Sequence, residues 1–136
     1  MGLCLATPAL ALALSWPAFT LSWTHSVEKT EWRERWRADA GELVLDEARV
    51  RGSGAGMDPP DGSVLRDGWW VYHHALRVPA LHLAVSGATV SGWRVCPGDP
   101  PDGCIELERR LAHGGVLPER IEIRPGGDCT PLAAAR

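Results

Sequence analysis

The chain has no excess of basic residues, and this absence removes one class of partner at once. Its 14 Lys and Arg residues are outnumbered by 17 Asp and Glu residues, which gives a formal net charge of −3. Proteins that bind nucleic acid gather positive charge on one face, because phosphate contacts supply much of their affinity. The sequence contains no basic patch and no aromatic platform flanked by Lys and Arg. We therefore expect no nucleic-acid partner.

Basic residues are also missing from the start of the chain, where the first Lys or Arg is Lys29. The apolar stretch 3–19 therefore lacks the positively charged segment that opens a usual export signal. Pro8 and Pro17 interrupt it, so it is too short and too broken to cross a bilayer as a helix. Its leucines alternate with alanines, which is typical of a strand. We expect the first strands of a domain here, without a transmembrane segment of its own; an atypical export signal is the alternative.

Long uninterrupted segments are lacking as well, because turn residues divide the chain at short and fairly even intervals. Many short strands between Gly and Pro turns predict an all-β sandwich or barrel-like domain of antiparallel strands. We expect a single domain over residues 1–124 and a flexible tail, rich in Gly, Pro and Ala, over 125–136. The predicted strands cover residues 2–7, 9–15, 19–28, 42–50, 68–74, 80–86, 92–96, 104–109 and 120–124.

One segment is ambiguous between helix and strand. Trp32 and Trp36 lie four residues apart, which would place them on one face of a helix over 30–38. Upstream, Leu21 and Trp23 occupy odd positions, and one extra residue would produce the switch to even positions. We favour a strand that continues through a bulge.

Seven tryptophans stand against one Phe and one Tyr. Buried Trp carries a large apolar area and requires a partner for its ring N–H. We expect most of the tryptophans to fill a thin β core, and one or two to line a ligand or partner surface.

Four cysteines are present, and two of them bracket a loop rich in Pro and Gly. Cys96 and Cys104 could face each other across a hairpin and form a disulfide in an oxidising compartment. In the cytosol they would be small apolar residues at strand ends. The spacing of the cysteines does not match that of a structural zinc site, and we expect neither a metal site nor a cofactor.

The candidate site residues gather between positions 25 and 34. Three carboxylates lie near one another there, and paired acids can perform acid–base chemistry. The Lys and Arg residues between them make mutual neutralisation on a solvated face the commoner outcome. We expect a binding role, and the alternative is a small hydrolase-like enzyme that uses His25 and the nearby carboxylates. The candidate residues in this stretch are His25, Ser26, Glu28, Glu31 and Glu34.

A glycine-rich stretch over 52–57 supplies the other candidates, Gly54, Gly56 and Met57. Its backbone N–H groups could contact a ligand, or its glycines could form a tight turn or allow close backbone approach, and both interpretations stay open. It is not a dinucleotide-binding fingerprint, because Pro59 and Pro60 forbid the helix that should follow.

In combination these stretches resemble a known family. Trp-Thr-His-Ser-Val-Glu-Lys-Thr-Glu-Trp at 23–32, Glu34, and Gly-Ser-Gly-Ala-Gly-Met at 52–57 are similar to the family called domain of unknown function 1850. Gly-Trp-Trp-Val-Tyr at 68–72 and Trp-Arg-Val-Cys at 93–96 resemble its shorter members. The resemblance extends over most of the chain and implies no reaction.

Members of that family are typically encoded beside TAXI-class TRAP transporters, which import organic anions and similar solutes. The resemblance therefore implies a non-enzymatic accessory or binding component of such a system, with the transporter permease or its solute-binding protein as partner. We expect a cytoplasmic protein that reaches the membrane through its partner. A periplasmic location is the alternative, because some relatives carry an N-terminal membrane anchor.

Overall fold

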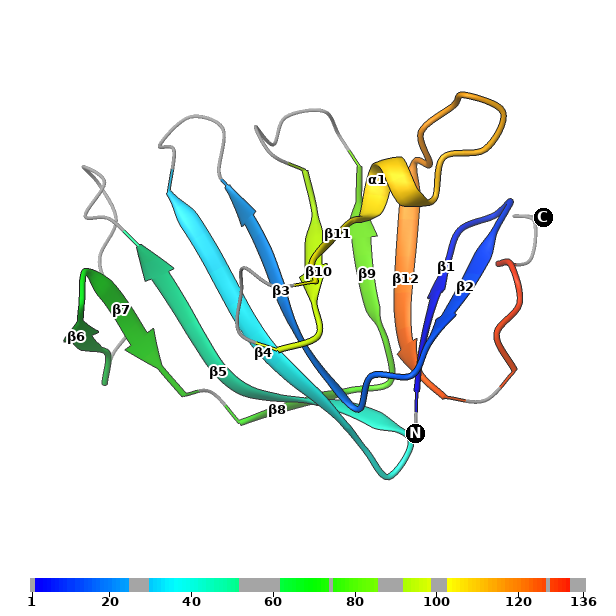
Figure 1. Ribbon diagram of the computed structural model, residues 1–136. Helices are drawn as coiled ribbons and strands as arrows, with labels where there is room; N and C mark the ends of the chain where they lie inside the picture. Colours follow the sequence, from blue (N-terminus) through cyan, green and yellow to red (C-terminus); the bar gives the residue numbers. More distant parts are fainter. Residues whose placement is uncertain are drawn as a thin grey trace.

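The computed structural model describes residues 2–24, 30–51, 62–73, 75–85, 92–98, 103–126 and 128–132. Within them the chain forms two antiparallel sheets and one short helix (Figure 1), so the predicted all-β fold is confirmed. The smaller sheet has the strand order β2-β1-β12-β9. Its strands are β1 (Leu3–Ala6), β2 (Ala11–Leu14), β9 (Leu81–Ala84) and β12 (Arg120–Pro125).

The larger sheet has the order β11-β10-β3-β4-β5-β7-β6, and β8 pairs with β5 outside this path. Its strands are β3 (Ala18–Thr24), β4 (Glu31–Asp39), β5 (Glu42–Arg51), β6 (Val64–Arg66), β7 (Trp69–Tyr72), β8 (Leu76–Val78), β10 (Arg94–Cys96) and β11 (Ile105–Glu106). β6 and β8, of three residues each, were not predicted.

The first strands lie where the sequence predicted them. β1 and β2 pair in an antiparallel hairpin, and every residue of β1 is buried. The Thr7 hydroxyl accepts hydrogen bonds from the backbone N–H groups of Ala9 and Leu10, at 3.2 and 2.9 Å. This side chain therefore fixes the turn that joins the two strands.

The ambiguous tryptophan segment is a strand, as favoured, but not a continuation of the preceding one. β4 runs antiparallel to β3, and Trp23 pairs with Trp32 while Phe19 pairs with Trp36. Each of these pairs joins an odd-numbered to an even-numbered residue. The reversal of the chain therefore accounts for the change of apolar residues from odd to even positions, which the sequence analysis assigned to a bulge. A bulge does occur, between β4 and β5, where Asp46 is the extra residue.

The segment 104–109 was predicted as a strand and is only partly one. β11 covers two residues, and the helix α1 (Leu107–Arg110) follows at once. Leu107 and Leu111 are both buried, and the Leu111 N–H donates to the Leu107 carbonyl at 2.9 Å. Leu107 and Leu111 would share a face on a strand as well as on a helix, so the spacing of apolar residues alone could not distinguish the two.

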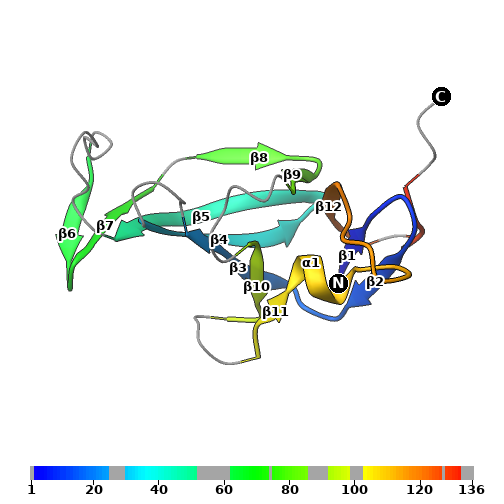
Figure 2. The same cartoon turned by 90° about the horizontal axis from the view of Figure 1, so that it is seen from above.

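The core lies between the two sheets. Leu5 and Ile121 come from the smaller sheet, Phe19 and Trp36 from the larger one, and Leu107 from α1. In Figure 2, α1 lies between β10 and the β1–β2 hairpin. The helix therefore closes one side of the shared core.

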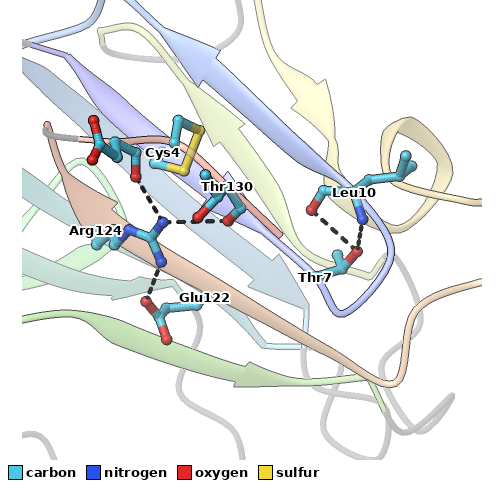
Figure 3. The surroundings of a disulfide bond; sticks show 8 residues. Cys4, Thr7, Leu10, Glu122, Arg124 and Thr130 are labelled. Carbon is cyan, nitrogen blue, oxygen red and sulfur yellow. Dashed lines mark hydrogen bonds and ion pairs between the residues drawn. A yellow bond between two sulfur atoms is a disulfide. The ribbon is translucent and has the colours of Figure 1, made fainter. Parts of the chain in front are cut away.

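Two disulfides link all four cysteines. Cys96 bonds to Cys104, a disulfide that the sequence analysis gave as possible. Cys4 bonds to Cys129, a pair that the sequence analysis missed. The Cys4–Cys129 bond fastens the segment 128–132 to the smaller sheet (Figure 3).

Arg124 secures the same segment. Its guanidinium donates to the backbone carbonyls of Asp128 and Thr130, at 3.0 and 3.3 Å, and forms an ion pair with Glu122 at 3.0 Å. The Leu132 N–H donates to the Thr7 carbonyl at 2.8 Å. Residues 128–132, which the sequence analysis placed in the tail, thus lie along the smaller sheet.

Candidate functional site

The structure describes two of the eight predicted binding residues, Glu31 and Glu34, both on β4. The other six lie outside the described residues: His25, Ser26, Glu28, Gly54, Gly56 and Met57.

The two motif stretches nevertheless join the described chain at neighbouring points. Thr24 pairs with Glu31, Glu31 pairs with Arg51, and Arg51 pairs with Trp69, so these four residues form one row across β3, β4, β5 and β7. The first motif follows Thr24 and the second follows Arg51 in the sequence. We call the end of the larger sheet marked by this row the motif end.

Glu31 and Glu34 were grouped as nearby carboxylates, and the structure separates them. Successive side chains of a strand point to opposite faces, so residues three positions apart lie on different sides of the sheet. Glu34 shares the inner face with Trp32 and Trp36, while Glu31 shares the outer face with Arg33. The two acids cannot act on one substrate atom as a pair.

Glu34 lies among apolar groups on the inner face. Its cross-strand neighbours are Leu21 and Ala48, and its carboxylate accepts a hydrogen bond from Trp36 Nε1 at 3.1 Å. Burial raises the pKa of Glu34, and the hydrogen bond from Trp36 opposes that rise. Burial and the negative charge of Glu34 together raise the pKa of Tyr72.

Three tryptophans pack together near Glu34. The rings of Trp23 and Trp32 stack at 6.0 Å with planes 4° apart, and Trp93 approaches Trp23 at 5.0 Å with a tilt of 50°. Trp93 Nε1 donates to the Ala84 carbonyl at 3.0 Å, which satisfies its polar edge. All three rings are half-buried, whereas Trp36 and Trp69 are buried. Some tryptophans therefore lie in the buried interior, and three others form a partly exposed cluster.

On the outer face the charges neutralise one another, as the interleaved sequence predicted. Arg33 Nε donates to Glu31 Oε2 at 2.9 Å, and Arg49 forms an ion pair with Glu47. The Arg33 guanidinium also lies 4.5 Å from the centre of the Trp69 ring. Glu31 is therefore a surface carboxylate held by a neighbouring arginine.

A small polar cavity of about 140 Å³ opens beside this row, and the sequence analysis did not anticipate it. Ser22, Trp23, Thr24, Glu31 and Arg94 line it. The alternation of β3 placed Ser22 and Thr24 on one face, but nothing in the sequence indicated that β10 would bring Arg94 opposite Ser22.

The described histidines are dispersed. His73 hydrogen-bonds the Asp46 carbonyl at 2.9 Å on the larger sheet, while His82 lies 3.8 Å from Glu122 on the smaller one. Within the described part of the chain, neither of these two interactions involves a Ser, Thr or Cys side chain. Within the same part of the chain, no group of His, Cys, Asp and Glu could hold a metal ion. No described helix is long and apolar enough to span a bilayer.

The family model for the domain of unknown function DUF1850 matches residues 19–101. The chain belongs to this family. The matched part of this DUF1850 protein runs from β3 to β10 and contains both motif stretches, whereas β1, β2, α1 and β12 lie outside it. No curated protein and no solved structure matches the chain.

Proposed function

We propose that this DUF1850 protein is a non-enzymatic accessory or binding component of a TAXI-type TRAP solute transport system. In this proposal the motif end of the larger sheet contacts the transporter permease or its solute-binding protein. The family resemblance supplies the transport context, because its members are encoded beside such transporters.

One observation carries the binding role. The row Thr24–Glu31–Arg51–Trp69 adjoins both motif stretches, and on it the acid is paired with Arg33 while two arginines lie over a tryptophan ring. Arginine is enriched at protein interfaces, and stacking over the buried Trp69 ring holds the two planar guanidiniums in place for a partner. Because Glu31 forms an ion pair with Arg33, we assign it a role in holding Arg33 in place on this surface and not in proton transfer.

The two disulfides support an extracytoplasmic location for this component. Disulfides persist in oxidising compartments such as the periplasm and are rare in the cytosol, where thiols are kept reduced. Both bridges form here, and they connect parts of the chain 125 and 8 residues apart. We therefore favour the periplasmic side of the membrane. Alkylation of free thiols in protein that is denatured directly from cells tests this, since Cys4 and Cys96 are buried in the folded chain. Cytosolic protein would be labelled at all four cysteines and periplasmic protein at none.

Affinity purification from native membranes in mild detergent tests the transport role. We expect the wild-type protein to recover the permease or the solute-binding protein, and His25→Ala and Glu28→Ala to reduce that recovery. His113→Ala and Glu119→Ala are matched controls, because both residues are exposed and lie outside the family match. Equal recovery by all four folded variants, or the absence of any transport partner, would contradict the proposal.

The hydrolase alternative has one observation in its favour. Glu34 is a dehydrated carboxylate with a raised pKa, and such groups occur at catalytic sites. A screen of ester and amide substrates with wild-type, His25→Ala and Glu34→Gln proteins separates the two functions. Turnover that both substitutions abolish would establish the enzyme and displace the accessory role.

A further inference from the structure

The outer face of β3 carries a column of hydroxyl groups from Thr20, Ser22 and Thr24. Thr20 and Ser22 are 3% and 4% exposed. The Thr20 hydroxyl has no hydrogen-bond partner within the part of the chain that the structure describes. The hydroxyls of Ser22 and Thr24 line the polar cavity. Neither forms a hydrogen bond with another described residue. Buried hydroxyls are almost always hydrogen-bonded, and of the three only the Thr20 hydroxyl is fully buried without a partner among the described residues. The Ser22 and Thr24 hydroxyls line the cavity and are open there to a polar group from outside.

Arg94 supplies positive charge at the same place. It lies opposite Ser22 on β10, and its other cross-strand neighbour, Glu106 on β11, forms its ion pair with Arg109 at 3.7 Å. No ion pair of Arg94 is present among the described residues. An exposed guanidinium beside two hydroxyls offers several hydrogen-bond donors to one anionic group.

The remaining charge of the cavity limits the ligand to a single negative charge. Glu31 also lines the wall, and Arg33 neutralises it through the 2.9 Å ion pair. One unpaired cation, Arg94, is then left for the ligand. A dianion such as phosphate would place a second charge near the Glu31 carboxylate with no cation to balance it.

The size of the cavity sets a further limit. Its volume of about 140 Å³ compares with a share of roughly 30 Å³ for one molecule in liquid water. The cavity therefore accommodates a carboxylate with a short carbon chain. Its volume lies below the range of about 300–1,000 Å³ that is usual for pockets that hold a whole drug-sized ligand.

We propose that this cavity binds the carboxylate group of a small organic acid, with Arg94 as its cation and Ser22 and Thr24 as hydroxyl donors. The site consists only of described residues and does not depend on the transport role. A protein that failed to recover any transporter component could still bind a carboxylate here, and the reverse is equally possible.

Titration of the ¹⁵N-labelled full chain with sodium acetate, followed by amide chemical shifts, tests this site. We expect saturable shifts centred on Ser22, Thr24 and Arg94, while the amides of Leu5 and Ile121 in the smaller sheet stay in place. Sodium chloride and sodium phosphate at matched ionic strength serve as parallel titrations. We expect chloride to give no saturable shift and phosphate to bind more weakly than acetate.

Substitutions assign the binding to individual groups. Arg94→Gln removes the charge and is expected to weaken acetate binding about tenfold or more. Ser22→Ala removes one hydroxyl without changing the charge and is expected to weaken it severalfold. Arg110→Gln, an exposed arginine on α1, is the matched control and leaves the affinity unchanged.

Three results would overturn the proposal. The first is the absence of saturable acetate binding to the wild-type protein. The second is unchanged affinity in Ser22→Ala, which decides the matter even if Arg94→Gln fails to fold. The third is phosphate binding as tight as acetate binding, which would assign the cavity to another anion.

Discussion

Trp23 and Trp32 face each other across β3 and β4, with ring centres 6.0 Å apart and planes within 4° of parallel. They form the last inner-face pair of the hairpin before the first motif stretch. Cross-strand aromatic pairs contribute about 0.5–1.5 kcal/mol beyond the area that they bury. The stack therefore holds the two strands in register next to the motif.

A double-mutant cycle measures this contribution. We expect Trp23→Ala, Trp32→Ala and the double variant to give a coupling free energy of about 1 kcal/mol in urea unfolding. The pair of Trp23 and Trp70 is the control, because these rings form no stacking contact within the described part of the chain. Additive losses for Trp23 and Trp32 would show that the stack does not stabilise the hairpin.

A second prediction concerns the turn between β4 and β5. Ala40 has a φ of 52° and Gly41 a φ of 79°, the positive values of a two-residue hairpin turn that favours Asn-Gly or Asp-Gly. The left-handed conformation costs most L-residues about 1 kcal/mol, and Asn tolerates it better. Ala40→Asn should therefore raise the free energy of unfolding by up to about 1 kcal/mol.

The turn between β6 and β7 provides the matched comparison. Asp67 and Gly68 have φ values of 51° and 85°. Because Asp is already a favourable residue at the first position, Asp67→Ala should lower stability where Ala40→Asn raises it. Changes of the same sign at the two turns would contradict this account.

The third prediction concerns the two disulfides. A bond stabilises by restricting the unfolded chain, and the effect grows with the length of the loop that it closes. For separations of 125 and 8 residues, this model gives about 5 kcal/mol for Cys4–Cys129 and about 2.5 kcal/mol for Cys96–Cys104. Urea unfolding of the Cys4→Ala/Cys129→Ala and Cys96→Ala/Cys104→Ala variants should show the larger loss for the first. Equal losses would mean that loop length does not set their contributions.

The fourth prediction follows from the raised pKa of Glu34. Its ordinary value is 4.5, and burial lets the folded state hold the proton more tightly than the unfolded state. The contribution of Glu34 to stability is therefore fully present below pH 4.5 and is lost as the pH rises through the higher pKa of the folded state. Glu34→Gln removes this dependence, so the variant should gain stability relative to the wild type as the pH rises.

Urea unfolding of both proteins below pH 4.5 and at neutral pH checks this prediction. Glu119→Gln is the control for the change of Glu to Gln, because that carboxylate is exposed. A Glu34→Gln difference that does not change with pH would show that burial of the carboxylate has no net cost.

Local alternation and turn residues sufficed to predict much of the fold. The alternating leucines of the first segment and the Gly and Pro residues between segments located β1, β2 and β5. β6 and β8 escaped notice because their residues are mostly exposed and carry no alternating burial. The Cys4–Cys129 bond escaped notice because the pairing of distant cysteines depends on β1 lying beside β12.

The candidate site was predicted less completely than the fold. Strand alternation implied that Ser22 and Thr24 share a face, and the interleaved charges implied that Glu31 would be neutralised. The position of Arg94 depends on β10 pairing with β3 across more than sixty intervening residues. No local pattern encodes such a pairing, so the cavity became visible only in the folded chain.

The place of β12 in the smaller sheet has a consequence for biosynthesis. β12 pairs with β1 on one side and β9 on the other, although more than a hundred residues separate it from β1 along the chain. The β1–β2 hairpin is therefore translated long before the strand that completes its sheet, and its apolar edge stays without that neighbour in the meantime. Unpaired strand edges invite association between nascent chains. A partner that shields this edge until β12 emerges would act on the yield of the protein without being part of its finished structure.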